Sequence, residues 1–182
     1  MPKNSAAPTM LRVISGSHKG RKLASPRSSA THPMGAREKN ALFNMIDVVG
    51  KRVLDAYAGS GALGIEALSR GAGEVVFVES HRPAVVTIEH NLASLNLTAD
   101  VFPGKVANCV AEQTGLFDVI IADPPYDKID FAEITSLPSL LVAGGTLALS
   151  SPASQPAPEI AGLAIVSSHT YAEARITIFV KP

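Results

Sequence analysis

The sequence predicts an α/β fold built on one mostly parallel, seven-stranded sheet whose last strand is antiparallel. Three observations support this prediction. Short β-prone segments alternate with segments of helical periodicity. The strand segments are continuously apolar, as expected for parallel strands that are covered on both faces. The last two strand segments, 163–167 and 175–180, follow each other without an intervening helix, so we expect them to pair antiparallel.

Each element has a local sequence signal. The other sheet strands are expected at residues 52–56, 74–79, 99–102, 117–122 and 146–150, and helices at 62–70, 83–95, 106–112 and 131–141, the last broken near Pro138. Ahead of the sheet, residues 11–15 and 21–23 flank a turn and predict a small hairpin. Residues 35–48 have a helical pattern, with Arg37, Lys39 and Asn40 expected outside the apolar face.

The chain has 182 residues, of which 46% are apolar, enough for one sizeable core. We expect a disordered tail at 1–10, a basic extension at 11–50 and a catalytic domain at 51–182. The first residues lack the apolar core of a signal peptide, and no apolar run approaches a membrane span. With a single cysteine, Cys109, expected to be buried, a cytoplasmic protein is predicted. The five histidines lack ligand spacing, so we expect no metal site; we also expect a monomer.

The formal net charge is zero, but the charges are unevenly distributed. Residues 1–52 contain 10 Lys and Arg against 2 Asp and Glu, whereas residues 53–182 contain 6 against 14. A basic front on an acidic domain favours contact with a polyanion such as nucleic acid, the alternative being a solvated arm without a partner. The candidate RNA-binding residues are Arg12, Lys19, Arg21, Lys22 and Arg37.

The stretch from Val53 to Gly64 is expected to form a strand, a tight turn and the start of a helix. Its spacing Gly59-x-Gly61-x-x-Gly64 fits a dinucleotide-binding turn, although a plain strand-to-helix turn has the same spacing. Asp55 favours a different ligand, because a carboxylate beside a pyrophosphate is unfavourable. S-adenosylmethionine, which carries an ammonium and a sulfonium and no phosphate, suits Asp55 better than a nicotinamide nucleotide.

Glu79 is expected to end the next strand, where an acidic side chain can bind ribose hydroxyls. The candidate cofactor-binding residues are Asp55, Tyr57, Gly59, Ser60, Gly61, Gly64 and Glu79.

The most specific short motif is Asp123-Pro124-Pro125-Tyr126, which follows the strand expected at 117–122. Its prolines have no N–H, so the Asp123 carboxylate and the Pro124 carbonyl are left as acceptors. These acceptors match the two N–H groups of an exocyclic amine on a nucleobase and would hold its nitrogen in line with a methyl donor. Tyr126 offers a ring for stacking. The alternative is a rigid turn without chemistry.

The chain resembles the RsmD-type family of 16S rRNA guanine-N2 methyltransferases over roughly residues 11–180. The resemblance rests on Arg12–Gly16 with Lys19–Leu23, on Arg37–Asn44, on Asp55–Ala72, on Glu79, on Asn91-Leu92 and on Asp123–Tyr126. It implies a Rossmann-like S-adenosylmethionine-dependent methyltransferase fold with a small basic N-terminal hairpin and helix. The sequence departs from the family at His32–Ala36, where members usually have an Arg-Pro-Thr run.

By this resemblance, the expected activity is methyl transfer from S-adenosylmethionine to the N2 amine of one guanine in small-subunit rRNA. The cofactor would be held by the glycine turn and Glu79, the base by Asp123–Tyr126, and the RNA by the hairpin and Arg37. Two alternatives remain open: an adenine- or cytosine-amine DNA methyltransferase, and a non-catalytic rRNA-binding assembly factor. An NAD oxidoreductase is disfavoured by Asp55 and by the acceptor-only turn.

Overall fold

The computed structural model describes residues 11–26, 34–112, 115–127 and 129–182. Its main sheet has seven strands in the order β5-β4-β3-β6-β7-β9-β8. The predicted disordered tail at 1–10, together with His32 and Pro33 of the divergent loop, lies outside the described residues. Within them, no helix combines the length and apolar character needed to cross a membrane.

The first five strands in the sheet order pair parallel with their neighbours. The predicted antiparallel pairing of the last strand of the chain is confirmed. The strands are β3 (Arg52–Ala56), β4 (Glu74–Glu79), β5 (Asp100–Pro103), β6 (Phe117–Ala122), β7 (Leu141–Pro152), β8 (Ala164–Tyr171) and β9 (Ala174–Val180). In β3, β4 and β6 most residues are buried, as expected for strands covered on both faces. Strand β9 lies between β7 and β8 and pairs antiparallel with both.

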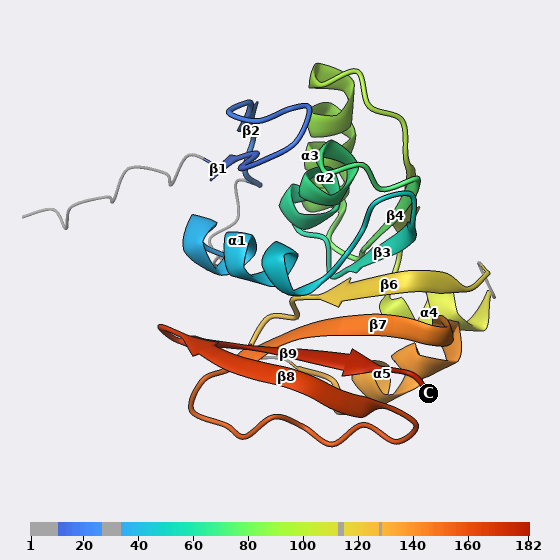
Figure 1. Cartoon of the computed structure of the whole chain (residues 1–182). Helices are drawn as coiled ribbons and strands as arrows, with labels where there is room; N and C mark the ends of the chain where they lie inside the picture. The colour runs from blue at the N-terminus through green and yellow to red at the C-terminus, as the bar shows by residue number, and fades with distance from the viewer. Residues whose placement is uncertain (1–10, 27–33, 113–114, 128) are drawn as a thin grey trace, which may run out of the picture.

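Helices cover both faces of the sheet (Figure 1). One apolar cluster packs α1 (Ala36–Met45), α2 (Ala62–Ser69) and α3 (Arg82–Ser94) against one face. A second packs α4 (Val106–Ala111), α5 (Phe131–Ser136) and the 3₁₀ turn η1 (Leu137–Leu140) against the other. Cys109 lies in the second cluster and is buried, as predicted.

The region around Pro138 differs from the predicted broken helix over 131–141. Helix α5 ends at Ser136, the 3₁₀ turn contains Pro138, and Leu141 already begins β7. Proline cannot supply the N–H that an α-helix interior needs, so the chain tightens and then leaves the helix. Strand β7 is consequently longer than the predicted 146–150, with a register shift between Phe117 and Val119 on its partner β6.

The predicted N-terminal hairpin is confirmed. Strand β1 (Leu11–Arg12) pairs antiparallel with β2 (Lys22–Leu23), and Figure 1 shows the hairpin beside α2 and α3. Leu11, Val13 and Leu23 belong to the same apolar cluster as the core strands. The hairpin is therefore packed against the sheet-bearing part of the chain.

The expected outward position of Lys39 is wrong, because this side chain is buried. Residues three and four apart share a helix face, so Lys39 lies on the same face as the buried Leu42 and Phe43. Its ammonium donates to the carbonyl of Arg12 at 2.8 Å and lies 3.4 Å from a Glu66 carboxylate oxygen. Lys39 thus joins α1 to the hairpin and to α2.

Glu66 of α2 is the polar centre of this junction. Its carboxylate, 0% exposed, accepts hydrogen bonds from the backbone N–H groups of Ile14 at 2.7 Å and Ser15 at 2.9 Å. Arg70 donates to it from one turn further along α2 at 2.8 Å, and Lys39 supplies a second positive charge. A buried carboxylate with this many partners holds the hairpin, α1 and α2 together.

Candidate functional site

The candidate site lies where β3, β4 and β6 end, at the edge of the sheet where open α/β folds bind ligands. Strands β3 and β4 pair parallel with Ala56 opposite Val78, and β3 and β6 pair parallel with Ala56 opposite Ala122. The residues that follow, Tyr57, Glu79 and Asp123, are therefore brought to neighbouring strand ends. The structure confirms the expected strand, turn and helix around the glycines.

Asp55 is joined to the glycine turn by a hydrogen bond. One of its carboxylate oxygens accepts the backbone N–H of Gly64 at 2.7 Å, and the side chain is 1% exposed. The other oxygen is buried without a hydrogen-bond partner in the described chain. Burial raises the pKa of Asp55 to about 7, with smaller contributions from the charges of Asp123 and Glu79 and opposed by the Gly64 hydrogen bond.

The glycines have different functions in the turn. Gly59 has a positive φ of 56°, and a Cβ there would meet open space, so the backbone is accessible to a ligand. A Cβ at Gly64 would instead collide with the Phe77 ring, which shows that this glycine permits close packing of α2 on β4. Gly61 is the left-handed N-cap of α2.

Glu79 is tied to the same turn by both carboxylate oxygens. One accepts the backbone N–H of Gly59 and the other that of His81, both at 2.7 Å. The carbonyl of Ser60 accepts a hydrogen bond from the side-chain amide of Asn91 at 2.9 Å. Asn91 also bonds the backbone N–H and carbonyl of Ala24, so one buried amide joins the glycine turn to the chain that leaves the hairpin.

Tyr57 has an unusual backbone conformation for a residue other than glycine, with φ at 65°. Its hydroxyl donates to the Glu133 carboxylate at 3.1 Å, joining the turn to α5. Burial and the Glu133 charge raise the pKa of this hydroxyl, so it stays protonated. Backbone strain at a strand end is common in functional sites.

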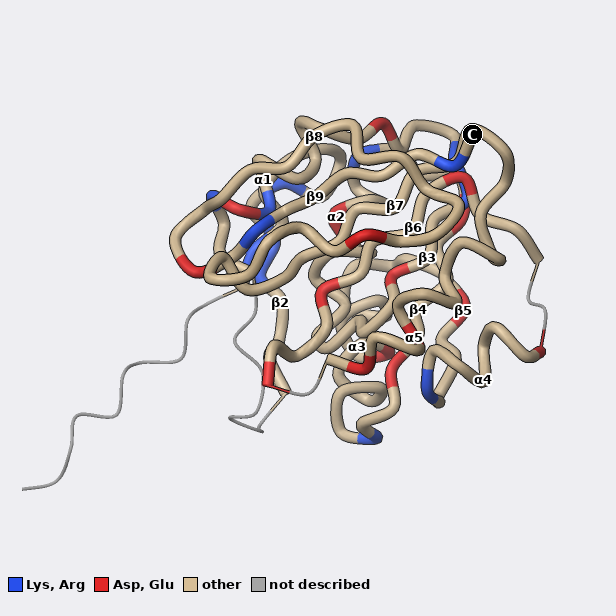
Figure 2. Tube along the Cα trace, turned by 90° about the horizontal axis from the view of Figure 1, so that it is seen from below, with Lys and Arg blue, Asp and Glu red and all other residues tan. Residues whose placement is uncertain are grey.

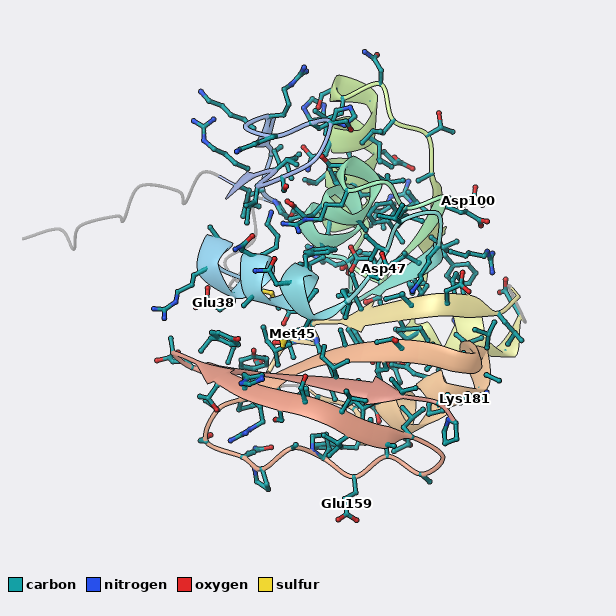
Figure 3. All side chains as sticks on the ribbon, viewed as in Figure 1. Glu38, Met45, Asp47, Asp100, Glu159 and Lys181 are labelled. Atoms are coloured by element: carbon teal, nitrogen blue, oxygen red, sulfur yellow. The ribbon has the colours of Figure 1, made fainter. Side chains whose placement is uncertain are left out.

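The Asp123–Tyr126 turn follows β6 directly. Pro124 is buried, Asp123 and Pro125 are half-buried, and Tyr126 is 38% exposed with its ring accessible for stacking. Burial raises the pKa of Asp123 to about 6, while a hydrogen bond from Ser150 lowers it. Burial also raises the pKa of the Tyr126 hydroxyl, and Glu38 at the start of α1 adds to this shift (Figure 3).

The predicted RNA-binding cations are all exposed but do not gather at one point. Backbone groups of Ser17 and His18 and the Arg21 side chain bond Ser69 and Ser94, the last residues of α2 and α3. Those helix ends lie at the sheet edge opposite the candidate site. Arg37 lies in the first turn of α1 and precedes Glu38, which acts electrostatically on Tyr126. Figure 2 shows Lys and Arg concentrated around β2 and α1, with Asp and Glu spread over the rest.

A family model described as "Conserved hypothetical protein 95" matches residues 11–180. The chain belongs to this family. It is 42% identical over 125 residues to YlbH of Bacillus subtilis, a candidate rRNA methyltransferase, in an alignment that covers 65% of this chain and 68% of that protein. It is 34% identical over 128 residues to Ribosomal RNA small subunit methyltransferase D of Escherichia coli, covering 69% of this chain and 65% of that protein.

A solved structure supports the same assignment over nearly the whole fold. The candidate methyltransferase yhhF of Escherichia coli superposes with a TM-score of 0.85 at 26% identity, covering 94% of this chain and 98% of that one. The predicted RsmD-type family and the methyltransferase fold are thereby confirmed. The names of these relatives and of this structure are those of methyltransferases.

The sequence predicted the glycine turn, Glu79 and Asp123–Tyr126 as site residues, but it made no prediction for two residues whose side chains contact them. Ser150 and Glu133 contact the predicted site residues through side chains that no local motif marks. The predicted strand ending at residue 150 was the only available signal for Ser150, because it places that residue at the same sheet edge as Asp123.

Proposed function

We propose that this protein transfers a methyl group from S-adenosylmethionine to the exocyclic N2 amine of one guanine in small-subunit rRNA. The observation that carries the proposal is the parallel register of β3 and β6, which brings the glycine turn and the Asp123–Tyr126 turn to adjacent strand ends. Membership of a family whose relatives include small-subunit rRNA methyltransferases supports the substrate class.

The residues present fit the cofactor. The accessible backbone at Gly59 allows close approach. The buried oxygen of Asp55, which has no partner in the described chain, can accept a hydrogen bond from a cationic ligand, whose charge would favour the ionised carboxylate. Glu79, fixed by two backbone N–H groups, keeps lone pairs that can accept ribose hydroxyls. When bound, S-adenosylmethionine supplies an electrophilic methyl group.

The target turn acts on the nucleobase. The Asp123 carboxylate and the Pro124 carbonyl accept the two N2 hydrogens, which orients the nitrogen lone pair toward the methyl group and favours its change to tetrahedral geometry. The Tyr126 ring stacks on a base that has left its helix. Asp123 need not be a strong base, because the nitrogen becomes acidic once methylated and then loses its proton to solvent.

The substrate RNA is held over a wide surface. The hairpin lies toward the far sheet edge, and Arg37 lies at the start of α1, whose next residue, Glu38, acts electrostatically on Tyr126. RNA that contacts both would extend along one side of the molecule. Contacts of these side chains would be with phosphates and would position the RNA without reading its sequence. We further propose that the protein acts as a monomer.

The test is labelled methyl transfer to small ribosomal subunits from cells that lack this protein, followed by mapping of the modified nucleotide. We expect incorporation at one guanine and none into subunits that already carry the modification. Absence of incorporation, alongside an active control methyltransferase, would refute the proposal. Preferential transfer to duplex DNA would favour the DNA alternative, and failure to bind S-adenosylmethionine in calorimetry would favour a non-catalytic assembly factor.

A further inference from the structure

Ser150 lies at the end of β7, beside the proposed target turn. The register of β6 and β7 places Ala122 opposite Leu149, so Asp123 and Ser150 are the next residues of two adjacent parallel strands. Ser150 also pairs with Ile176 of β9, and it is only 1% exposed. The antiparallel pairing with β9 continues past Ser150 to Pro152, so the Ser150 backbone lies within the sheet.

The Ser150 hydroxyl joins the two ends of the target turn. Its oxygen lies 2.6 Å from the Tyr126 hydroxyl. Ser150 follows Leu149, the β7 residue opposite Ala122, so the same hydroxyl lies beside Asp123 at the neighbouring strand end, where it lowers the pKa of that carboxyl group. An ionised carboxylate only accepts hydrogen bonds, so the Ser150 hydrogen points to Asp123. Tyr126 must then donate to the Ser150 oxygen, which gives the order Tyr126 to Ser150 to Asp123.

The two prolines between Asp123 and Tyr126 explain why a bridge through the Ser150 hydroxyl matters for this turn. Pro124 and Pro125 have no N–H and cannot donate backbone hydrogen bonds that would tie the turn to its surroundings. A hydroxyl on a central strand provides that tie through side chains. It fixes the carboxylate, which would orient the amine, relative to the ring, which would stack on the base.

We propose that Ser150 is a positioning residue for methyl transfer, holding Asp123 and Tyr126 in one geometry through its single hydroxyl. This inference rests on the proposed function for its kinetic consequence, but the hydrogen-bond order itself does not. Displacing a reacting group by about 1 Å costs on the order of 100-fold in rate, so a positioning bond of this kind has a measurable kinetic effect.

The contact between Ser150 and Asp123 can be detected through the pKa of Asp123. The Ser150 hydrogen bond lowers the pKa of Asp123 against the larger effect of burial. The other titratable groups that interact with this pair are Asp55, at the end of β3, and Glu38 of α1, which acts on Tyr126. Loss of the Ser150 hydroxyl should therefore raise the pKa of Asp123 further while leaving those neighbours in place.

The experiment compares Ser150→Ala, Ser150→Thr and Ser151→Ala with the wild type. Ser151 is the matched control, because it is the adjacent buried serine and its hydroxyl has no partner in the described chain. We expect Ser150→Ala to lower kcat about 10- to 100-fold with unchanged KM for S-adenosylmethionine, and to move the acidic limb of the kcat profile to higher pH. Ser150→Thr, which keeps the hydroxyl, should restore both, and Ser151→Ala should change neither.

A second measurement does not depend on activity. Carbon NMR of the Asp123 carboxyl group, titrated in each variant, should show a higher pKa in Ser150→Ala only, with thermal melts used to check that each variant is folded. If Ser150→Ala fails to fold, Tyr126→Phe provides the test, because it breaks one arm of the bridge and should lower kcat while the Asp123 titration stays near that of the wild type.

The results separate this inference from the proposed function. An unchanged Asp123 titration in Ser150→Ala, or an equal kinetic loss in Ser151→Ala, would overturn the role of Ser150. Failure of the wild type to methylate ribosomal subunits, with the titration shift observed, would overturn the proposed function and leave the hydrogen-bond order established.

Discussion

Glu66 and Asp55 are both almost completely buried carboxylates, but their surroundings are opposite. Glu66 has two cationic side chains and two backbone N–H groups around it. Asp55 has one backbone N–H and an oxygen without a partner in the described chain, and burial raises its pKa to about 7. A buried carboxylate whose oxygens all have partners, here called saturated, maintains the fold. A buried carboxylate at a strand end that lacks a partner for one oxygen, here called under-saturated, is available for a ligand.

Glu66→Gln gives the largest expected effect on the saturated side of this comparison. It leaves the Lys39 ammonium buried without its countercharge, and breaking a buried pair in this way costs about 3–5 kcal/mol of unfolding free energy. Urea denaturation measures this loss of unfolding free energy. The control is Glu74→Gln, which removes the partially exposed pair with Arg52 and should cost no more than about 1 kcal/mol. Equal losses in both variants would contradict the central role of Glu66.

Asp123→Ala tests the neighbouring strand end, where the carboxylate is proposed to contact the substrate and not to maintain the fold. Loss of the acceptor that would orient the amine should lower kcat by about 10²- to 10³-fold, the range found when one pre-organised polar group is removed from an active site. Cofactor affinity, measured by calorimetry, should stay within about 3-fold, because the glycine turn is untouched. A matching loss of cofactor binding would instead place Asp123 in the cofactor site.

Asp55→Asn sharpens the comparison through pH. In the folded protein Asp55 keeps its proton up to about pH 7, whereas the unfolded chain releases it near 4, so the wild type loses stability as pH rises between these values. The variant lacks this loss and should gain on the order of 4 kcal/mol relative to the wild type at pH 8 compared with pH 4, since each unit of pKa difference corresponds to about 1.4 kcal/mol. Thermal melts at both pH values measure it.

Cofactor affinity should change in the opposite sense, falling in Asp55→Asn and further in Asp55→Ala. A stability difference that stays constant across pH would contradict this prediction, because it would show that folding leaves the pKa of Asp55 unchanged.

Lys19→Ala combined with Lys22→Ala should give the smallest effect. Both side chains are exposed, and removing each phosphate-binding cation should reduce the slope of log affinity against log salt by about 0.7–0.9. Binding to small subunits, measured at several salt concentrations, reports the slope. Lys105→Ala, an exposed lysine that precedes α4, is the control and should leave the slope unchanged.

Sequence patterns predicted the parts of the site whose chemistry is local. Asp55 and the glycines lie within one strand, turn and helix, and Asp123–Tyr126 is a contiguous turn, so their residue types and spacing were informative. Ser150 was not predictable in this way. Its role depends on the register of β7 against β6 and on the contact between the Tyr126 hydroxyl and the Ser150 hydroxyl. Both are set by packing between segments that are distant in sequence.

Lys39 shows why periodicity alone misplaces some residues. Its helical position is that of a buried residue, but a lysine is normally assigned to the exposed face because burial of a charge is costly. The compensating carboxylate is that of Glu66 on α2, 27 residues away in sequence. The carbonyl that the Lys39 ammonium binds is that of Arg12 on β1. A partner at that distance leaves no trace in the local pattern.

The position of β9 between β7 and β8 has a consequence for how the protein is assembled during synthesis. The glycine turn and its strands emerge early and can form from neighbouring segments, but β7 acquires its second neighbour only when β9, the last strand in chain order, has been made. The turn that would receive the nucleobase is therefore completed last. A nascent chain could hold the cofactor turn in shape before it could position a substrate.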